Sequence, residues 1–346
     1  MRNAENFDAE RLVKRWELGS RDGRVRVPAH AWRSGGDERV SSPSVAAASA
    51  GRAVPIAQVD SFARGPFGGN PAVVVLEATG LAEDELPRIA AELRAPGTAF
   101  VFPPDASGVD RRVRVFTPAR EVSYSGHTTL ATAHALLETG VGGSHLVLAT
   151  GAGLVAIELE REGGRSVIWQ SPPLPRCRPA DMDLPPLLEA LGLAPDEVAD
   201  WGPPSLTPER DLLVPVRSLL ALRALAPDPV ALGSRAAAAQ LRGLALVSRE
   251  TLEPSSGTHT RFFAPHVGIP EDIVTGSAHA AVGAWLAEAG LLEAGDGTTR
   301  FVGEQGDGLG RPARLLVEVA RAGGRTTRVR IGGTAVTVVT GTLHLP

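Results

Sequence analysis

The chain has 346 residues, a formal net charge of −4 and a hydrophobic content of 43%. Its length suits two domains of ordinary size, and its composition is typical of a soluble globular protein. No stripe of basic residues predicts a nucleic-acid partner, and no apolar run of about 18 residues predicts a membrane span.

Two residue types are scarce, and each scarcity excludes a class of mechanism. Lys14 is the only lysine, so a Schiff base, including one with pyridoxal phosphate, has almost no residue to form on. Cys177 is the only cysteine, which excludes an intrachain disulfide and a two-thiol racemase mechanism. A chain without disulfides suits a reducing compartment, and we expect the protein to be cytoplasmic.

Residues 1–53 differ from the rest of the chain in composition and in sequence pattern. The stretch "RSGGDERVSSPSVAAASAGRA" at residues 33–53 is small, polar and without a period, as is typical of disordered segments. Its "VAAASA" resembles a signal cleavage site, but no apolar core of about 7–15 residues precedes it. We therefore interpret residues 1–53 as a disordered leader or extension and not as a secretion signal.

From Val54 onwards, alternating and β-branched runs predict strands. In the first half these runs cover residues 54–62, 70–76, 97–104, 110–118, 145–162 and 165–173. Helices are expected at residues 83–94 and after Gly126. Prolines become dense between residues 176 and 208 and indicate a crossover to the second half.

The second half repeats this order loosely. Strands are expected at residues 210–216, 243–250, 259–265, 313–320 and 328–345, with helices at residues 230–241 and after Gly276. Strands gathered around one buried helix in each half predict an α+β fold of two similar domains, at residues 54–172 and 173–346. The last strand is expected to be able to return to the first domain.

One strand–loop–helix piece occurs twice. "FTPAREVSYSGHTTLATAHALLETG" covers Phe116–Gly140, and "FAPHVGIPEDIVTGSAHAAVGAWLAEAG" covers Phe263–Gly290. Both share Phe-x-Pro, a Gly that opens an Ala-rich apolar run, and a closing Leu-x-x-x-Gly. Internal duplication is the more economical interpretation, and a chance match is the alternative.

The two helices of this repeat are apolar on nearly every face, which predicts that both are buried. The first turn of each helix still leaves about four backbone N–H groups without helical partners. These groups and the positive end of the helix dipole favour a bound anion. Gly126 and Gly276 would permit a close approach of the backbone. We expect the two helix starts to face each other across a cleft and to bind a small carboxylate.

The two copies differ in the residue after the glycine. His127 follows Gly126, and a helix start should lower the pKa of its imidazole, which then hydrogen-bonds a substrate or transfers a proton. Ser277 follows Gly276 and offers a hydroxyl, while Asp272 in the connector is placed to orient an amine or hold a proton. The simpler alternatives are that His127 and Ser277 cap their helices and that Asp272 is an acidic turn residue.

At these residues the chain resembles the PhzF family of phenazine-biosynthesis-type isomerases. The resemblance rests on "VDSFARGPFGGNPAVVVL", "RVFTPAREVSYSGHTTLATA", "RFFAPHVGIPEDIVTGSAHA" and "EQGDGLGRPARLLVEV", in order, over roughly residues 56–340. It implies the diaminopimelate-epimerase-like fold, in which two pseudo-symmetric domains each wrap a curved mixed sheet around a central helix, with the active site between them. It also implies acid/base isomerisation of a small amino or carboxylic acid, no cofactor, no metal and a homodimer.

By motif, the resemblance assigns site roles to Gly126, His127, Asp272, Gly276 and Ser277. Asn70 lies in the Gly-Asn-Pro motif, where it either lines the substrate cleft or serves as a turn residue.

One position departs from the family pattern. The usual proton carrier is the Glu of a Ser-Glu-Thr motif, and this chain has Pro96, Gly97 and Thr98 there. Loss of a positioned acid/base group should lower the rate of the familiar reaction by about 10²–10⁴-fold. Three interpretations follow: another group transfers the proton, the pocket catalyses a different lyase or cyclase reaction, or it binds a small molecule without catalysis.

Overall fold

The computed structural model describes residues 51–162, 165–292 and 295–346. Residues 51–346 form one compact unit. The predicted leader lies outside the described residues except at its last three positions, and Arg52 and Ala53 belong to the first strand. The predicted division at residue 172 stays a prediction.

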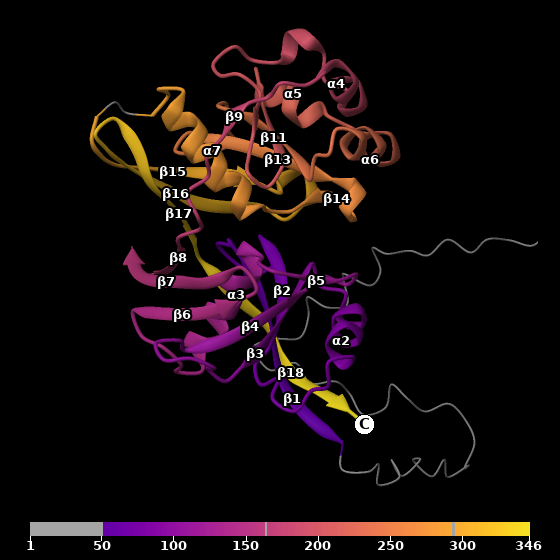
Figure 1. Cartoon of the computed structure of the whole chain (residues 1–346), viewed down its shortest axis with the longest axis vertical. Coiled ribbons are helices and arrows are strands. Elements are labelled where there is room, and N and C mark those ends of the chain that lie inside the picture. Colours follow the sequence, from indigo (N-terminus) through magenta and orange to yellow (C-terminus); the bar gives the residue numbers. More distant parts are fainter. Residues whose placement is uncertain (1–50, 163–164, 293–294) are drawn as a thin grey trace, which may run out of the picture. The chain divides into compact units, whose positions relative to one another are not determined.

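The N-terminal lobe, as we define it here, consists of residues 52–170 and the returning strand β18 (Ala335–Leu345). Its strands are β1 (Arg52–Ser61), β2 (Asn70–Val75), β3 (Gly97–Phe102), β4 (Arg111–Phe116), β5 (Glu121–Val122), β6 (His145–Thr150), β7 (Gly153–Glu162) and β8 (Arg165–Gln170), and its helices are α2 (Glu85–Leu93) and α3 (Gly126–Glu138). In Figure 1 the yellow strand β18 runs beside β1, with which it pairs antiparallel along its length.

The C-terminal lobe consists of residues 178–333. Its strands are β9 (Arg178–Pro179), β10 (Ser205–Leu206), β11 (Asp211–Val216), β12 (Gly243–Ser248), β13 (Thr258–Ala264), β14 (Ile269–Asp272), β15 (Gly297–Gln305), β16 (Ala313–Ala322) and β17 (Arg325–Gly333). Its α-helices are α4 (Pro185–Leu191), α5 (Leu219–Ala224), α6 (Pro229–Ala238) and α7 (Gly276–Glu288), with short 3₁₀ turns η1 (Pro195–Glu197), η2 (Pro265–Val267) and η3 (Asp307–Leu309).

The strand pairing repeats between the lobes. β2 pairs parallel with β3 as β11 does with β12, and β4 pairs parallel with β6 as β13 does with β15. Phe116 lies opposite Thr98, and Phe263 lies opposite Leu244, so Gly97 at the start of β3 is equivalent to Gly243 at the start of β12. The predicted α+β fold of two pseudo-symmetric mixed sheets is therefore confirmed.

Each sheet surrounds one buried helix (Figure 1). α3 and α7 both have 13 residues and begin at the glycines of the repeat. Leu130 and Leu136 of α3 share one apolar core with Ala280 and Ala284 of α7. Burial of one leucine side chain contributes about 1.5–3 kcal/mol, so this shared core holds both helices in place. Among the described helices, none is long and apolar enough to span a bilayer.

Strands β8 and β17 form the seam between the lobes. They pair antiparallel, with Trp169 opposite Gly332. The Trp169 ring is buried, and the guanidinium carbon of Arg330 lies 4.3 Å from its centroid. Arg330 in turn donates to Glu318 and to Glu158 of β7, so a charge network that contains residues of both lobes lies over the indole.

Several elements differ from the sequence prediction. The proline-rich crossover contains β9, β10 and α4, and the strand β15 was not predicted. The polar connectors of the repeat also contain the short strands β5 and β14, which pair with β4 and β13. Strands of two to four residues carry too little periodicity to be recognised in a sequence.

We predict that the seam tolerates no side chain at Gly332. A Cβ atom there would lie 2.5 Å from Trp169 Cε3, so Gly332→Ala should lower the free energy of unfolding by about 1–3 kcal/mol. Gly341→Ala in β18 is the matched control, because nothing lies within 4 Å of its Cβ position. Urea unfolding compares the two, and equal stability would contradict the packing at this seam.

Candidate active site

The starts of α3 and α7 meet. A Cβ atom built on Gly126 would lie 3.8 Å from the Cα of Gly276, and one built on Gly276 would lie 3.9 Å from the Cα of Gly126. The Cβ position of Gly276 is also 2.6 Å from Ile331 Cδ1. A side chain at Gly276 would therefore collide with Ile331, whereas a Cβ atom at Gly126 would only touch the facing helix start.

Asp272 is the last residue of β14, and its side chain is only partly exposed. Its Oδ1 accepts a hydrogen bond from Asn70 Nδ2 (2.9 Å), and its Oδ2 accepts one from Thr275 Oγ1 (2.7 Å). Removal from water raises the pKa of Asp272 to about 6 in spite of these donors. A carboxyl group with this pKa is able to hold or release a proton near neutral pH.

His127 is the second residue of α3. Ser125 occupies the N-cap position, so His127 is not the cap of this helix. Its Nδ1 lies 3.3 Å from Ser125 Oγ, and its buried Nε2 has no hydrogen-bond partner within the described residues. Burial lowers the pKa of His127 to about 4, so the imidazole is neutral at pH 7. The predicted direction of this pKa shift is confirmed, and the cause of the shift is desolvation.

Two residues that face each other on neighbouring strands connect His127 with Asp272. Ser61 and Asn70 lie opposite each other in the β1–β2 ladder. Ser61 Oγ donates to the backbone carbonyl of His127 (2.7 Å), and the buried Asn70 donates to Asp272. Asn70 therefore connects the first lobe to the carboxylate of the second, a role its Gly-Asn-Pro motif alone did not predict.

Gly97 lies beside His127. A Cβ atom at this position would be 3.1 Å from His127 Nε2 and 2.0 Å from Thr128 Oγ1. The Thr128 hydroxyl, which lies 3.0 Å from Ser125 Oγ, thus fills the space in which a side chain of residue 97 would begin. The Nε2 atom of His127, which has no hydrogen-bond partner in the described part of the chain, therefore lies beside Gly97.

Ser277 is not the cap of α7 either, because Thr275 occupies that position. Its Oγ accepts a hydrogen bond from Arg242 Nη2 (3.1 Å), and Arg242 forms an ion pair with the buried Asp211. The sequence prediction missed Arg242. Arg242 directly precedes Gly243, the equivalent of Gly97, and lies outside both segments of the repeat.

Two glutamines brace the helix starts, and sequence reasoning did not single them out. Gln170 Nε2 at the end of β8 donates to the Gly126 carbonyl (2.8 Å). Gln305 Nε2 at the end of β15 donates to the Asp272 carbonyl (2.9 Å), while its Oε1 accepts from the Thr275 amide (3.2 Å). Gln305 belongs to the Glu-Gln-Gly motif, which was the available signal.

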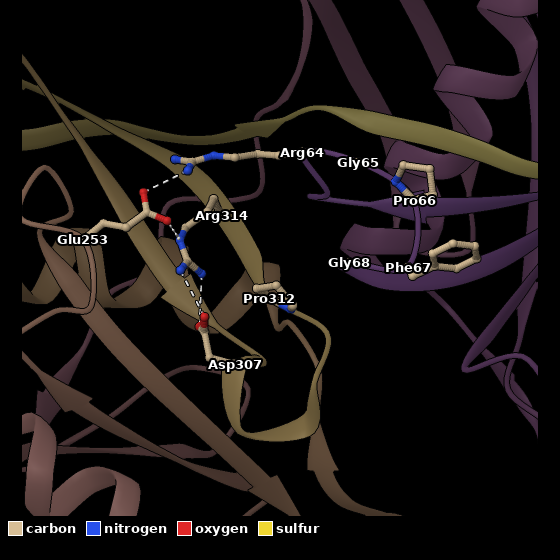
Figure 2. Close-up of a pocket in the computed structure, with 9 residues that line it drawn as sticks. All are labelled: Arg64, Gly65, Pro66, Phe67, Gly68, Glu253, Asp307, Pro312 and Arg314. Carbon is tan, nitrogen blue, oxygen red and sulfur yellow. Dashed lines mark hydrogen bonds and ion pairs between the residues drawn. The ribbon is translucent and has the colours of Figure 1, made fainter. Parts of the chain in front are cut away.

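A separate pocket of about 410 Å³ lies between the β1–β2 loop and the C-terminal lobe (Figure 2). Its charged residues neutralise one another, because Glu253 binds both Arg64 and Arg314, and Arg314 also binds Asp307. Neither His127 nor Asp272 lines this pocket.

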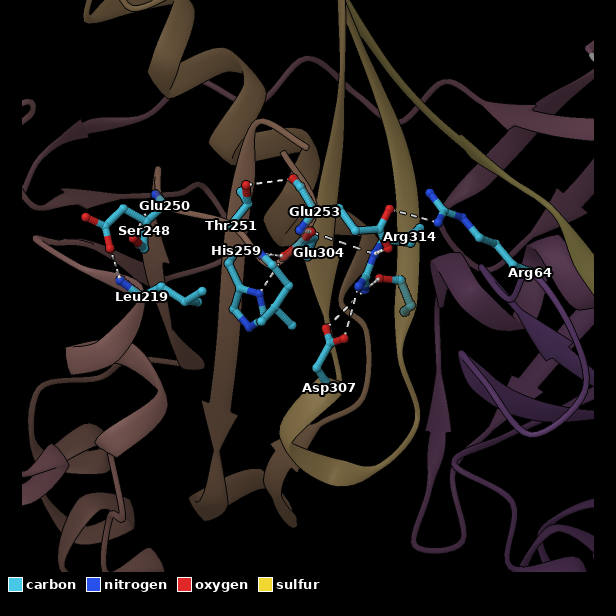
Figure 3. A network of polar contacts seen from close by, with 12 residues as sticks. Arg64, Leu219, Ser248, Glu250, Thr251, Glu253, His259, Glu304, Asp307 and Arg314 are labelled. Atoms are coloured by element: carbon cyan, nitrogen blue, oxygen red, sulfur yellow. Dashed lines mark hydrogen bonds and ion pairs between the residues drawn. The ribbon is translucent and has the colours of Figure 1, made fainter. Parts of the chain in front are cut away.

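Figure 3 shows that this network of charged side chains extends to the buried pair of Glu304 and His259. Glu304 Oε2 lies 2.8 Å from His259 Nδ1, and the Glu304 carboxylate also accepts from the amides of Leu252 and Glu253. Each charged residue in this chain of contacts has an oppositely charged or hydrogen-bonding partner inside the fold, so we assign the network to packing of the C-terminal lobe. Among the described residues, no cluster of three or more His, Cys, Asp or Glu is placed to hold a metal ion.

Comparison with solved structures defines the class of protein. A PhzF-family phenazine biosynthesis protein of Bacillus anthracis matches 84% of this chain and 99% of its own, with a TM-score of 0.78 and 27% identity. A hydroxyproline epimerase of Agrobacterium vitis shares the fold alone, with a TM-score of 0.54 and 15% identity. The chain therefore has the two-lobed epimerase-type fold.

Sequence comparison identifies the family. The trans-2,3-dihydro-3-hydroxyanthranilate isomerase of Pseudomonas chlororaphis is 35% identical over 298 residues, which cover 83% of this chain and 98% of the relative. An uncharacterized isomerase of Bacillus subtilis is 30% identical over 81% of this chain and 95% of its own. The family model described as phenazine biosynthesis-like protein matches residues 59–341. The chain belongs to this PhzF family.

The raised pKa of Asp272 predicts a pH-dependent gain of stability in Asp272→Asn. Burial holds the folded-state pKa near 6, above the ordinary value of 3.8, so wild type loses stability as the pH rises between these values. The free energy of unfolding of the variant should therefore be higher than that of wild type by on the order of 2 kcal/mol at pH 7. At pH 3.5 the two proteins should be equally stable.

Denaturant unfolding at both pH values measures this difference. The exposed Asp84→Asn is the control, because Asp84 makes no side-chain hydrogen bond to its helix. A stability difference that is the same at both pH values would contradict burial as the cause of the raised pKa.

Proposed function

We propose that the protein is a cytoplasmic, cofactor-independent isomerase that moves a proton within a small amino or carboxylic acid, in specialised metabolism. The observation that carries this proposal is the Asp272 carboxyl group, whose pKa of about 6 suits proton transfer and whose position is set by Asn70 and Thr275. The names of the relatives support isomerase chemistry.

In this proposal Asp272 is the proton carrier. The converging starts of α3 and α7 present backbone N–H groups to the substrate carboxylate and favour the negative charge that develops when a proton leaves an adjacent carbon. His127 faces the same region from the N-terminal lobe. Its neutral imidazole hydrogen-bonds the substrate and receives or returns the proton on that side.

Gly97 favours a second candidate function, a catalytically silent small-molecule-binding protein. With Thr128 packed into the space beside Gly97, residue 97 supplies no acid/base group. A lyase or cyclase reaction in the same pocket is a further alternative, in which orientation and electrostatics replace the second acid/base group.

Solvent exchange tests the first proposal against the second. We expect wild type in D₂O to incorporate deuterium at carbon into trans-2,3-dihydro-3-hydroxyanthranilate or a member of a panel of small amino and hydroxy acids. Asp272→Asn should lower the rate by about 10²–10⁴-fold, and so should His127→Ala. Asp84→Asn should leave the rate unchanged.

Mass spectrometry and NMR of the recovered acid measure the exchange. Tight binding of a panel member without exchange in wild type would favour the silent binding protein. Exchange at the full wild-type rate in Asp272→Asn would show that Asp272 is not the proton carrier.

The packing at Gly97 predicts that restoration of the family Glu requires a second change. Gly97→Glu alone should be destabilised, because its Cβ would lie 2.0 Å from Thr128 Oγ1. The pair Gly97→Glu with Thr128→Ala removes that hydroxyl and should raise exchange by about 10²–10⁴-fold over Thr128→Ala alone. Thermal unfolding and deuterium incorporation check both parts, and equal exchange in the double and single variants would contradict the expectation.

A further inference from the structure

Asp272 is the end point of a series of hydrogen bonds that begins inside α7. His279 Nε2 lies 3.0 Å from Gln305 Oε1. Gln305 Nε2 donates to Thr275 Oγ1 (3.3 Å), and Thr275 Oγ1 donates to Asp272 Oδ2 (2.7 Å). The first three of these residues are buried. We call the four residues, His279, Gln305, Thr275 and Asp272, the His279–Asp272 network.

Backbone partners fix the direction of every bond in this network. A backbone N–H only donates and a carbonyl only accepts, so Gln305 turns its oxygen to the Thr275 amide (3.2 Å) and its nitrogen to the Asp272 carbonyl (2.9 Å). The same oxygen faces His279, so the ring carries its hydrogen on Nε2. Because Thr275 Oγ1 accepts from Gln305, its own hydrogen points to Asp272. Each bond therefore donates towards the carboxylate.

The surroundings of His279 suit a neutral ring in this tautomer. A Cβ atom on Gly303 would lie 2.3 Å from His279 Nδ1, so the ring lies directly over this glycine. Nδ1 is buried and has no hydrogen-bond partner within the described residues. Burial lowers the pKa of His279 to about 4, although the hydrogen bond with Gln305 opposes this change. The ring is therefore uncharged in the pH range near 6 where Asp272 titrates.

The N-terminal lobe builds the same fold without this network. Strand register and the shared helix glycine match each residue of one lobe with its counterpart in the other. The counterparts of His279, Gln305, Thr275 and Asp272 are Thr129, Thr150, Ser125 and Val122. Gly303 is matched by the buried Leu148. The network thus occurs together with the acid and is not a requirement of the fold.

We propose that His279 is a positioning residue of the candidate active site, which acts through Gln305 and Thr275 to hold a fixed donor against the Asp272 carboxylate. The inference rests on the proposed function and deepens it, since Asp272 is the proposed proton carrier. Asn70 donates to the other oxygen of the carboxylate. A proton that arrives on the acid therefore has to displace one of two oriented donors.

The last bond of the network sets how readily Asp272 ionises. Burial raises the pKa of Asp272 to about 6, and the hydrogen bond from Thr275 is the strongest of the contacts that oppose this rise. Without the His279 donor, the Gln305 amide and the Thr275 hydroxyl lose part of their fixed orientation. The carboxyl group should then keep its proton to a higher pH.

Charged groups near the two ends of the network stay the same in all variants of the test. Arg242 acts on Asp272 through space, and His259 acts on His279. His259 is itself held by Glu304, with 2.8 Å between Nδ1 and Oε2. A change in the titration of Asp272 therefore reports the network and not a change in these charges.

Carbon-13 NMR of the aspartate carboxyl groups measures this titration, and the signal of Asp272 is identified by its absence from Asp272→Asn. The wild-type midpoint should lie at about 6. Thr275→Val removes the last donor and should raise the midpoint by about 1 pH unit. His279→Leu should raise it by about 0.5 pH unit. His279→Gln retains an N–H donor for Gln305 and should keep the wild-type midpoint.

Two controls separate this effect from a general structural one. The Thr275 side chain makes no capping hydrogen bond to α7, so Thr275→Val does not remove a helix cap. His134→Leu removes a partly buried histidine from α3, where it lies 3.2 Å from Glu138, and should leave the midpoint unchanged. The double variant His279→Leu with Thr275→Val should titrate as Thr275→Val alone does, because the histidine acts through the threonine.

A measurement on wild type keeps the test decisive if His279→Leu does not fold. Nitrogen-15 NMR should show His279 as a neutral ring with its hydrogen on Nε2, with the signal identified by its absence from His279→Gln. A hydrogen on Nδ1 would overturn the inference, as would a wild-type midpoint in Thr275→Val or additive effects in the double variant.

Neither NMR measurement depends on turnover. If deuterium exchange fails while the midpoint of Asp272 depends on His279, the isomerase proposal falls and the positioning role stands. If exchange occurs and the midpoint is indifferent to both His279 and Thr275, the positioning role falls and the isomerase proposal stands.

Discussion

The contact between Gly126 and Gly276 is the constraint on which the remaining architecture depends. Two helices that belong to different lobes begin side by side, since a Cβ atom at either glycine would be in van der Waals contact with the Cα of the other. The apolar faces of both helices fill a common core, which holds the approach in place. The polar groups around the helix starts are consequently drawn from both lobes.

The cross-lobe hydrogen bond of Asn70 to Asp272 shows how this geometry is used. Asp272 is shielded from water strongly enough to raise its pKa, yet both of its oxygens keep a donor. A buried carboxylate of this kind lowers the stability of the folded state at neutral pH. Proteins retain such groups at functional sites, where the shifted pKa serves the chemistry. His127 shows the opposite shift from the same physical cause.

Much of this arrangement could be predicted from the sequence, and particular residues show where prediction ended. The doubled segment indicated the two buried helices and their glycines, because apolar periodicity and Gly are local signals. Arg242 and Asp211 could not be assigned, since Asp211 begins β11, Arg242 precedes β12, and Arg242 meets Asp211 and Ser277 only in the folded protein. Thr128 was equally hidden, because its conflict with a side chain at Gly97 depends on how α3 packs on β3.

The pairing of β1 with β18 has a consequence for biosynthesis. The first strand of the described fold finds one of its two neighbours only among the last twelve residues of the chain. During translation β1 therefore keeps an unsatisfied edge until β18 has been synthesised, and non-local closure of this kind is slow and exposed to aggregation. Completion of the sheet around β1 thus depends on a strand that is made long after it.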